Sequence, residues 1–250
     1  MTELCVIHPG GLSTLCWKRL AKHLPAGTSL RVLELEAINA YWEQDTELTV
    51  DVLAERLKLT LDPRIERVLC GWGVGGVVAA ALAEKIAVAP RQVVILDGAA
   101  SMPRPGVPDL LRTYAMLVGA RRGRPVNLDE AVFEEGLEAT LEHLRSRIGG
   151  LRDNATTDVL RKGYHQHARD RLRDYRLTRT FEPSGSPVTV VKAARSLLPD
   201  TYALNWDRAA PFELLASGGD HYTMLTEPAP VVHLALLLGR WMNTPAALAA

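Results

Sequence analysis

The sequence has 250 residues, of which 47% are hydrophobic and 23% are charged, and its formal net charge is zero. This composition is typical of a globular protein with one large domain, and it carries no global sign of nucleic-acid or membrane binding. No window approaches the roughly 20 apolar residues of a membrane span, and the N-terminus lacks the basic and apolar regions of a signal peptide. We therefore expect a cytoplasmic protein that binds neither nucleic acid nor membranes.

Cysteine usage points the same way. The chain has three cysteines, Cys5, Cys16 and Cys70, which are too few and too scattered for a disulfide framework or a zinc site. All three lie in apolar surroundings, so we expect reduced thiols in the core, as in a cytosolic protein. No metal site is expected.

The first hundred residues alternate between apolar strands and helices. Strands are predicted over 3–8, 29–36, 66–71 and 91–98. Helices are predicted over 15–24, 48–61 and 74–86. Strands that are apolar throughout and alternate with helices indicate a mostly parallel sheet with helices on both faces.

The pattern then changes over residues 102–182, where only helices are predicted. They cover 109–119, 128–148 and 156–177; strands resume over 186–193 and 211–217, and a last helix covers 229–242. We therefore expect one domain over 1–250 with a helical insertion over 102–182. Because ligands of open α/β sheets bind outside the carboxyl ends of the strands, we expect the insertion to act as a lid.

The turn after the third strand is rich in glycine. It reads Gly71-Trp72-Gly73-Val74-Gly75, followed by Gly76 and an alanine-rich helix. A nucleophile elbow needs small residues two positions before and after its central residue, because bulk there would meet the neighbouring strand and helix. The glycines meet this requirement, but Gly73 stands where a serine hydrolase has its nucleophile. The segment lacks the Lys-Ser/Thr ending of a P-loop, and its glycine spacing fits a dinucleotide-binding turn poorly.

Three further segments carry a resemblance to a known family. The start "VIHPGGLSTLCWKRLAKHL", the strand "VVILDG" and the late loop "SGGDHYTML" resemble the corresponding parts of thioesterase domains from polyketide and nonribosomal-peptide synthases. These domains belong to the α/β-hydrolase superfamily, in which nucleophile, acid and histidine follow in that order along the chain. The resemblance implies an α/β-hydrolase fold and covers nearly the whole chain, with the nucleophile serine replaced by glycine.

The resemblance implies a role for six residues. His221 would be the general base, Asp97 its orienting acid, and Gly73 would occupy the nucleophile position. Val74 and Gly11 would offer backbone N–H groups to a developing oxyanion. His8 would be structural, beneath the oxyanion loop.

Other residues are alternatives for these roles. Asp200 and Asp207 are alternative acids, because many hydrolases carry the acid after a later strand. The alternative nucleophiles are weaker: Cys70 should point into the sheet packing, and Ser13 and Ser101 do not lie on an elbow. The "HQH" run over 165–167 has the wrong spacing for a helical metal pair, and both histidines are expected at the surface.

The insertion is polarised in charge. Its acidic part contains Asp129, Glu130, Glu134, Glu135, Glu138 and Glu142. Its basic part contains Arg145, Arg147, Arg152, Arg161, Lys162, Arg169, Arg171, Arg173, Arg176 and Arg179. The charges form either solvated helix faces with local ion pairs or a basic face for an acidic carrier protein or its phosphopantetheine phosphate.

A glycine at the elbow leaves three functions open. In the first, the protein catalyses without an acyl-enzyme, with His221 as base for cyclisation, condensation, elimination or release of a carrier-bound or free chain. In the second, Gly73 was introduced to inactivate an ordinary chain-releasing thioesterase or cyclase. In the third, a non-catalytic relative binds a carrier protein or a product. The partner expected is an acyl or peptidyl carrier protein, or a polyketide or peptide small molecule. No cofactor is expected beyond a carrier's phosphopantetheine.

Overall fold

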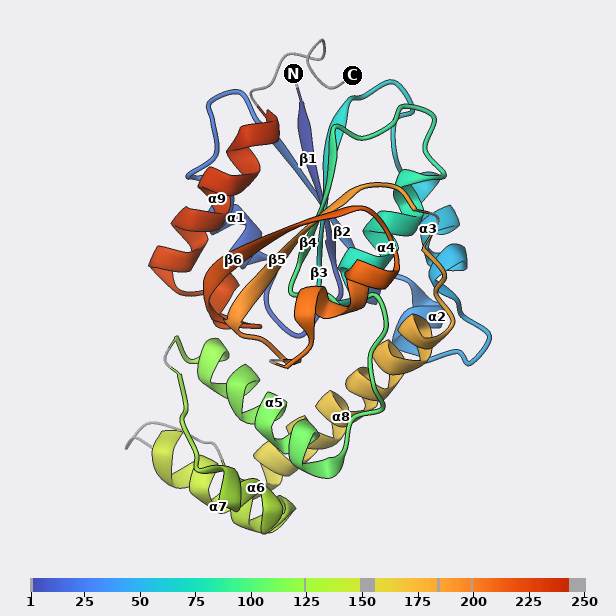
Figure 1. The fold of residues 1–250 in the computed structure, drawn as a ribbon. Helices are drawn as coiled ribbons and strands as arrows, with labels where there is room; N and C mark the ends of the chain where they lie inside the picture. Colours follow the sequence, from blue (N-terminus) through green and yellow to red (C-terminus); the bar gives the residue numbers. More distant parts are fainter. Residues whose placement is uncertain (1, 124, 149–155, 184, 199, 243–250) are drawn as a thin grey trace. The chain divides into compact units, whose positions relative to one another are not determined.

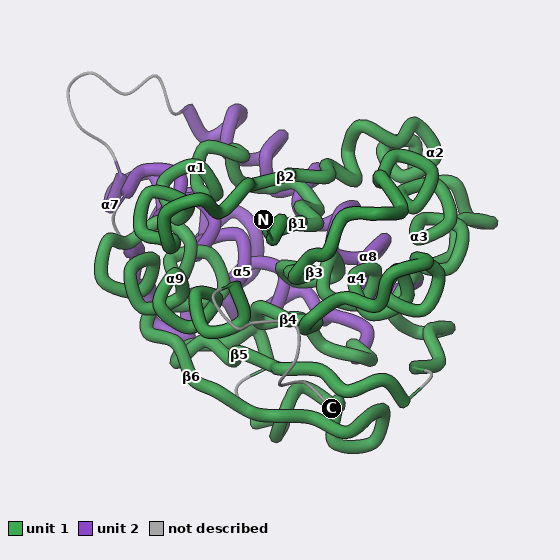
Figure 2. The backbone as a smooth tube through the Cα atoms, turned by 90° about the horizontal axis from the view of Figure 1, so that it is seen from above, with its two compact units in different colours: residues 1–102, 177–250 green, residues 103–176 purple. Residues whose placement is uncertain are grey.

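The structure is a computed structural model that describes residues 2–123, 125–148, 156–183, 185–198 and 200–242. The chain forms two compact units (Figure 2). One comprises residues 1–102 and 177–250, and the other comprises residues 103–176. The second unit is thus inserted into the first, within the 102–182 range predicted for the insertion.

The first unit is built on one six-stranded sheet. The strand order is β2-β1-β3-β4-β5-β6, and each pair of neighbouring strands is parallel. The strands are β1 (Glu3–His8), β2 (Ser29–Glu34), β3 (Arg67–Trp72), β4 (Gln92–Leu96), β5 (Val188–Arg195) and β6 (Phe212–Asp220). The inner strands β1 and β3 are buried along their whole length, which explains why their sequences are continuous apolar runs.

Helices cover both faces of this sheet (Figure 1). Helices α1 (Leu15–Ala21) and α9 (Pro228–Met242) lie on one face, and α3 (Val50–Lys58) and α4 (Val74–Ala83) lie on the other. The predicted parallel sheet with helices on both faces is confirmed. Short elements not predicted include η1 (Leu35–Ala37), α2 (Asn39–Trp42), η2 (Tyr202–Arg208) and η3 (Thr223–Leu225).

The inserted unit is helical and has its own apolar core. Its helices are α5 (Val107–Arg121), α6 (Glu130–Glu134), α7 (Leu137–Ile148) and α8 (Thr157–Arg179), the last of which ends in the first unit. The prediction of a single helix over 128–148 is wrong, because two helices, α6 and α7, form there. Gly136 has a φ of 95° and separates α6 from α7, since a left-handed residue cannot continue a right-handed helix. Whether the insertion acts as a lid stays a prediction.

Many charges of the insertion form ion pairs within it. Arg112 contacts Glu130 at 2.6 Å, Arg145 contacts Glu142 at 2.6 Å, and Arg161 contacts Glu138 at 2.8 Å. The expectation that all the basic residues lie on a solvated or docking face is wrong for two of them. Arg171 and Arg173 are buried, and both pair with Asp174. Arg152 lies outside the described residues.

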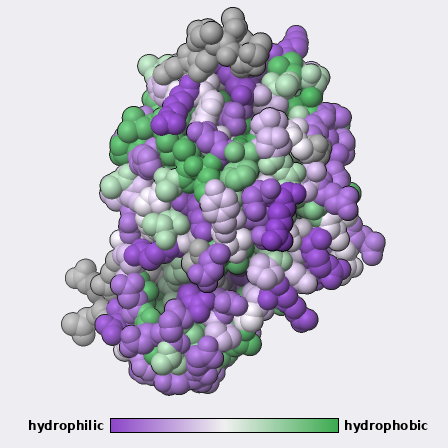
Figure 3. Space-filling view, in the orientation of Figure 1, coloured by the Kyte–Doolittle hydropathy of each residue, from purple (hydrophilic) through white to green (hydrophobic). Residues whose placement is uncertain are grey.

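The surface mixes polar and apolar side chains. In Figure 3, hydrophobic residues gather over the part of the molecule where α9 lies, and Leu236 of that helix is 65% exposed. Within the described part of the chain, we find no helix of the length and hydrophobicity needed to cross a membrane.

Candidate active site

The glycine-rich turn after β3 is packed so closely that its flanking positions accept no side chain. A Cβ on residue 71 would lie 2.1 Å from the Gly75 carbonyl oxygen, and one on residue 75 would lie 2.4 Å from the Ile7 carbonyl oxygen. A Cβ on residue 76 would lie 2.5 Å from Cγ2 of Ile95. These approaches are far inside van der Waals contact, so glycine is required at each position. The turn has the tight strand-to-helix geometry of a nucleophile elbow.

Gly73 lies at the apex of the elbow with φ 56° and ψ −129°, a conformation that L-residues adopt only under strain. Its N–H donates to the Leu96 carbonyl at 2.9 Å, which ties the apex to β4. A Cβ on residue 73 would point at His221, 3.3 Å from Cε1 and 3.5 Å from Nε2. The histidine ring therefore faces the place where a nucleophile side chain would stand.

The structure brings His221 and Asp97 together. His221 Nδ1 lies 2.8 Å from Asp97 Oδ2, and both side chains are buried. Asp97 follows β4 with a φ of 45°, and its Oδ1 accepts the Ala193 N–H at 3.0 Å. Burial alone would raise the pKa of Asp97, but hydrogen bonds from His221, Ser196 and Ala193 hold that pKa below its ordinary value.

This arrangement determines the tautomer of His221. An ionised carboxylate only accepts hydrogen bonds, so the proton shared with Asp97 belongs to His221 Nδ1. In the neutral ring Nε2 is then unprotonated. The lone pair that can take a proton is on the nitrogen that faces residue 73.

The alternative acids and nucleophiles differ from this buried pair in exposure or in reactivity. Asp200 and Asp207 are exposed, whereas the carboxylate that His221 contacts in the described part of the chain is that of Asp97. Ser13 and Ser101 are also exposed. Cys70 is fully buried in β3, and burial raises the pKa of its thiol far above its usual range, which leaves it protonated and unreactive.

The two candidate oxyanion donors follow neighbouring strands. Val74 is the first residue of α4, and a first-turn amide has no acceptor within its own helix. Gly11 follows β1 in a turn where its φ is 80°. Since β1 pairs with β3 in parallel, with Ile7 opposite Gly71, both residues lie at the carboxyl edge of the sheet.

His8 holds the turn that contains Gly11. The Trp17 Nε1–H donates to His8 Nδ1 at 3.1 Å, so the ring carries its proton on Nε2 and donates it to the Leu12 carbonyl at 2.9 Å. Burial lowers the pKa of His8, which keeps the ring neutral in this role. It therefore acts on the backbone next to Gly11.

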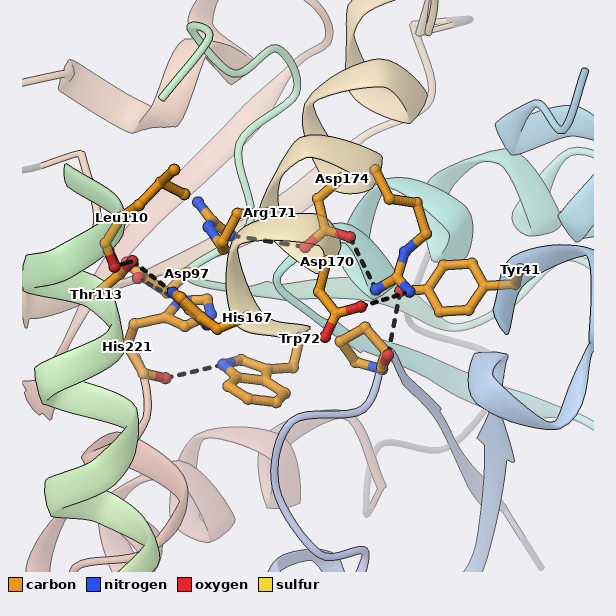
Figure 4. A network of polar contacts seen from close by, with 12 residues as sticks. Tyr41, Trp72, Asp97, Leu110, Thr113, His167, Asp170, Arg171, Asp174 and His221 are labelled. Carbon is orange, nitrogen blue, oxygen red and sulfur yellow. Dashed lines mark hydrogen bonds and ion pairs between the residues drawn. The ribbon is translucent and has the colours of Figure 1, made fainter. Parts of the chain in front are cut away.

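Three site features were not predicted. Trp72, between the first two glycines of the elbow, stacks on His221 with ring centroids 4.9 Å apart and donates its Nε1–H to the His221 carbonyl at 2.9 Å (Figure 4). Ser196 supports Asp97. Asp220 shapes the histidine loop, because its Oδ1 accepts the N–H groups of Tyr222 and Thr223. From its hydrophobicity alone, Trp72 would be assigned to the core. Only its position inside the elbow could have indicated a contact with the site.

The histidines of the insertion differ in their surroundings. His165 is exposed, as expected, but the surface position predicted for His167 is wrong: it is buried, with Nε2 2.7 Å from Thr113 Oγ1 (Figure 4). The Thr113 hydroxyl also donates to the Leu110 carbonyl, so it accepts from His167. Within the described ranges there is no cluster of three or more His, Cys, Asp or Glu residues that would hold a metal ion.

Solved structures with a similar fold cover nearly the whole of this chain. A holo four-domain nonribosomal peptide synthetase bound to AMP and glycine matches with a TM-score of 0.66 and 20% identity, over 98% of this chain but 20% of that chain. The RedJ thioesterase of the prodiginine pathway in Streptomyces coelicolor matches with a TM-score of 0.60 and 16% identity, over 96% and 90% of the two chains. The chain has the fold of a biosynthetic thioesterase domain.

A third structure with this fold is ClbQ from the colibactin nonribosomal-peptide and polyketide pathway. It matches with a TM-score of 0.60 and 13% identity, over 97% of both chains. No family model matches the sequence, and no curated protein matches it. At these identities the likeness establishes the fold, and the chemistry has to be argued from the site.

Proposed function

We propose that this chain is a thioesterase-like protein of polyketide or nonribosomal-peptide biosynthesis that acts without an acyl-enzyme. His221 would serve as general base for cyclisation, condensation, elimination or release of a carrier-bound or free chain. The observation that carries the proposal is the position of His221. Its Nε2 lies 3.5 Å from where a Cβ on residue 73 would be, and its Nδ1 is held by Asp97.

In the proposed reaction, the acyl carbonyl of a thioester lies at the elbow and is polarised by the N–H groups of Val74 and Gly11. A water, or a hydroxyl or amine of the substrate itself, occupies the space that Gly73 leaves beside His221 Nε2. As its oxygen or nitrogen bonds to the carbonyl carbon, His221 takes its proton. The imidazolium then returns the proton to the sulfur when the carbon–sulfur bond breaks. The products are a free thiol and an acid, lactone or lactam.

The same base serves carbon chemistry. A C–H between two carbonyl groups is acidic enough for a histidine to remove, and the oxyanion donors would stabilise the enolate. An acyl or peptidyl carrier protein with its phosphopantetheine arm is the partner we propose. The fold shared with domains of nonribosomal-peptide and polyketide pathways supports it.

The geometry also supports a second candidate, an ordinary thioesterase inactivated by glycine. If residue 73 were serine, its hydroxyl would lie beside His221 Nε2. This fit is what a site built for serine would show, so the two candidates differ in whether the glycine protein itself reacts.

The test is thiol release from acyl-N-acetylcysteamine thioesters, followed with a thiol reagent and by intact-protein mass spectrometry. We expect release above the buffer rate, no acyl adduct, and loss of release in His221→Ala. The matched control His23→Ala changes an exposed histidine of the same unit and should leave the rate unchanged. Thioester binding without turnover would support the non-catalytic alternative, and turnover that survives His221→Ala would contradict the proposal.

A further inference from the structure

The elbow tryptophan is the centre of a buried stack of three aromatic rings. Trp72 is 1% exposed, and its indole stacks on His8, at 5.8 Å and 17°, and on His221, at 4.9 Å and 28°. The Tyr222 ring lies edge-on to the indole at 5.7 Å. Contacts with three rings leave the buried indole few alternative rotamers.

The position of the stack follows from the sheet. Ile7 of β1 is opposite Gly71 of β3 in a parallel pair, so the residues that follow, His8 and Trp72, leave the carboxyl edge side by side. Side chains alternate between the faces of a strand, which puts both rings on the same face. Trp72 is also the residue just before Gly73. Its indole thus extends from the elbow itself. The backbone of the elbow is closely packed at Gly71 and Gly75, so the point from which the indole extends is fixed.

Two rings of the stack are bonded to the backbone of candidate catalytic segments. Trp72 Nε1–H donates to the carbonyl of His221 at 2.9 Å (Figure 4). His8 Nε2–H donates to the carbonyl of Leu12, which follows Gly11. One rigid group therefore connects the loop of the base to the turn of an oxyanion donor.

We propose that Trp72 is a positioning residue that holds His221 against residue 73. The hydrogen bond fixes the backbone of the histidine loop, and the stack fixes the tilt of the imidazole between Asp97 and the elbow. This inference rests on the proposed function only for the identity of the base. It requires no particular substrate.

The first test needs no turnover. The proton between His221 Nδ1 and Asp97 should give a far-downfield NMR resonance in the protein with Gly73, assigned by its loss in His221→Ala. We expect Trp72→Leu, which removes both the donor and the stack, to abolish or broaden this resonance. Trp72→Phe, which keeps a ring but removes the donor, should shift it. Leu53→Ala, which leaves a cavity at a fully buried side chain of α3, is the control for lost stability and should leave the resonance in place.

The second test measures turnover in a Gly73→Ser background with p-nitrophenyl esters. We expect Trp72→Leu to lower kcat at least tenfold with KM changed less than twofold, and Trp72→Phe to give a smaller loss. Leu53→Ala should lower the melting temperature without lowering kcat. If Gly73→Ser gives no hydrolysis, the proposed function is in doubt, while the resonance still tests the positioning role.

Two results would overturn the inference. One is a Trp72→Leu protein that keeps both the resonance and kcat. The other is a loss of kcat in Trp72→Leu that the Leu53→Ala control reproduces at equal loss of stability. If Trp72→Leu does not fold, Trp72→Phe decides by the same two readouts, because its ring preserves most of the packing.

Discussion

Replacing Gly73 by serine tests directly whether the pocket around the elbow is complete. In the structure, a Cβ on residue 73 would lie 3.5 Å from His221 Nε2, and an Oγ one bond further would come within hydrogen-bond distance of that nitrogen. His221 already contacts Asp97 at 2.8 Å, and Val74, the residue after the elbow apex, begins α4. We therefore expect Gly73→Ser to hydrolyse activated esters through an acyl-enzyme.

The gain should be large, because a serine and its base act as a unit. In a complete triad site, loss of the serine lowers kcat by roughly 10⁶, and binding with the oxyanion hole alone retains about 10³ to 10⁴ over water. We expect Gly73→Ser to raise p-nitrophenyl ester hydrolysis by about 10³-fold or more. A fluorophosphonate should label the variant at residue 73 and leave the glycine protein unlabelled, as read by mass spectrometry.

Two controls separate the serine from its surroundings. Gly73→Ala carries the same backbone strain and puts a methyl 3.3 Å from His221 Cε1, but it adds no nucleophile and should gain nothing. Gly73→Ser combined with His221→Ala has the hydroxyl without its base and should lose nearly all of the gain. A folded Gly73→Ser protein that neither hydrolyses esters nor takes the label would refute the reasoning, because it would show that the oxyanion site is not formed.

Three further predictions concern the supports of the site. Asp97→Asn in the serine background should lower kcat by about 10⁴, because an amide donates to His221 and favours the wrong tautomer; an unchanged kcat would exclude Asp97 as the partner. Because folding lowers the pKa of Asp97, its carboxylate stabilises the native state at neutral pH. This contribution should be lost as the pH falls below the unfolded value of 3.8 and through the native pKa. In urea titrations, the free energy of unfolding of Asp97→Asn should therefore depend less steeply on acid pH than that of the parent protein. Gly71→Ala forces a Cβ to 2.1 Å from a backbone oxygen and should prevent folding or lower the melting temperature steeply, whereas Gly218→Ala, with 3.5 Å to Pro230, should change it little in the same thermal scan.

The elements that the sequence predicts well are those with one dominant physical signal. The strand over 3–8 is observed with the same ends, because its six residues are buried in the middle of a parallel sheet and every side chain is selected for burial. The elbow was recognisable from its glycine spacing, because steric exclusion at 71, 75 and 76 leaves a direct trace in composition. Local sterics and burial are encoded position by position.

The features that were missed depend on partners distant in sequence. The stacking of Trp72 needs His8 and His221 from other segments, and an apolar run does not reveal which rings will meet. Ala203 and Leu204 take left-handed conformations that their residue types disfavour, and the neighbouring Asn205, whose residue type tolerates that conformation, takes it as well. They are held by contacts such as the Trp206 Nε1–H bond to the Gly98 carbonyl at 2.8 Å. Tertiary hydrogen bonds override local preference there, so propensity alone predicts the wrong backbone.

The backbone conformation at residue 73 should cost stability for any side chain, whether or not that side chain brings activity. The apex conformation is set by neighbours that leave no room to relax: Gly71, Gly75 and Gly76 around it, and Gly98, whose own Cβ would lie 2.2 Å from the Gly73 carbonyl oxygen. Any L-residue at 73 must therefore adopt a φ near 56°, at a cost of about 1–3 kcal/mol, which is about 2–12 °C in melting temperature for a protein of this size. Gly73→Ser and Gly73→Ala should lose this stability equally, but only the serine variant should gain hydrolysis. If the two losses differ widely, the backbone at the apex relaxes around the new side chain, and the elbow is not held by its neighbours in the way its contacts imply.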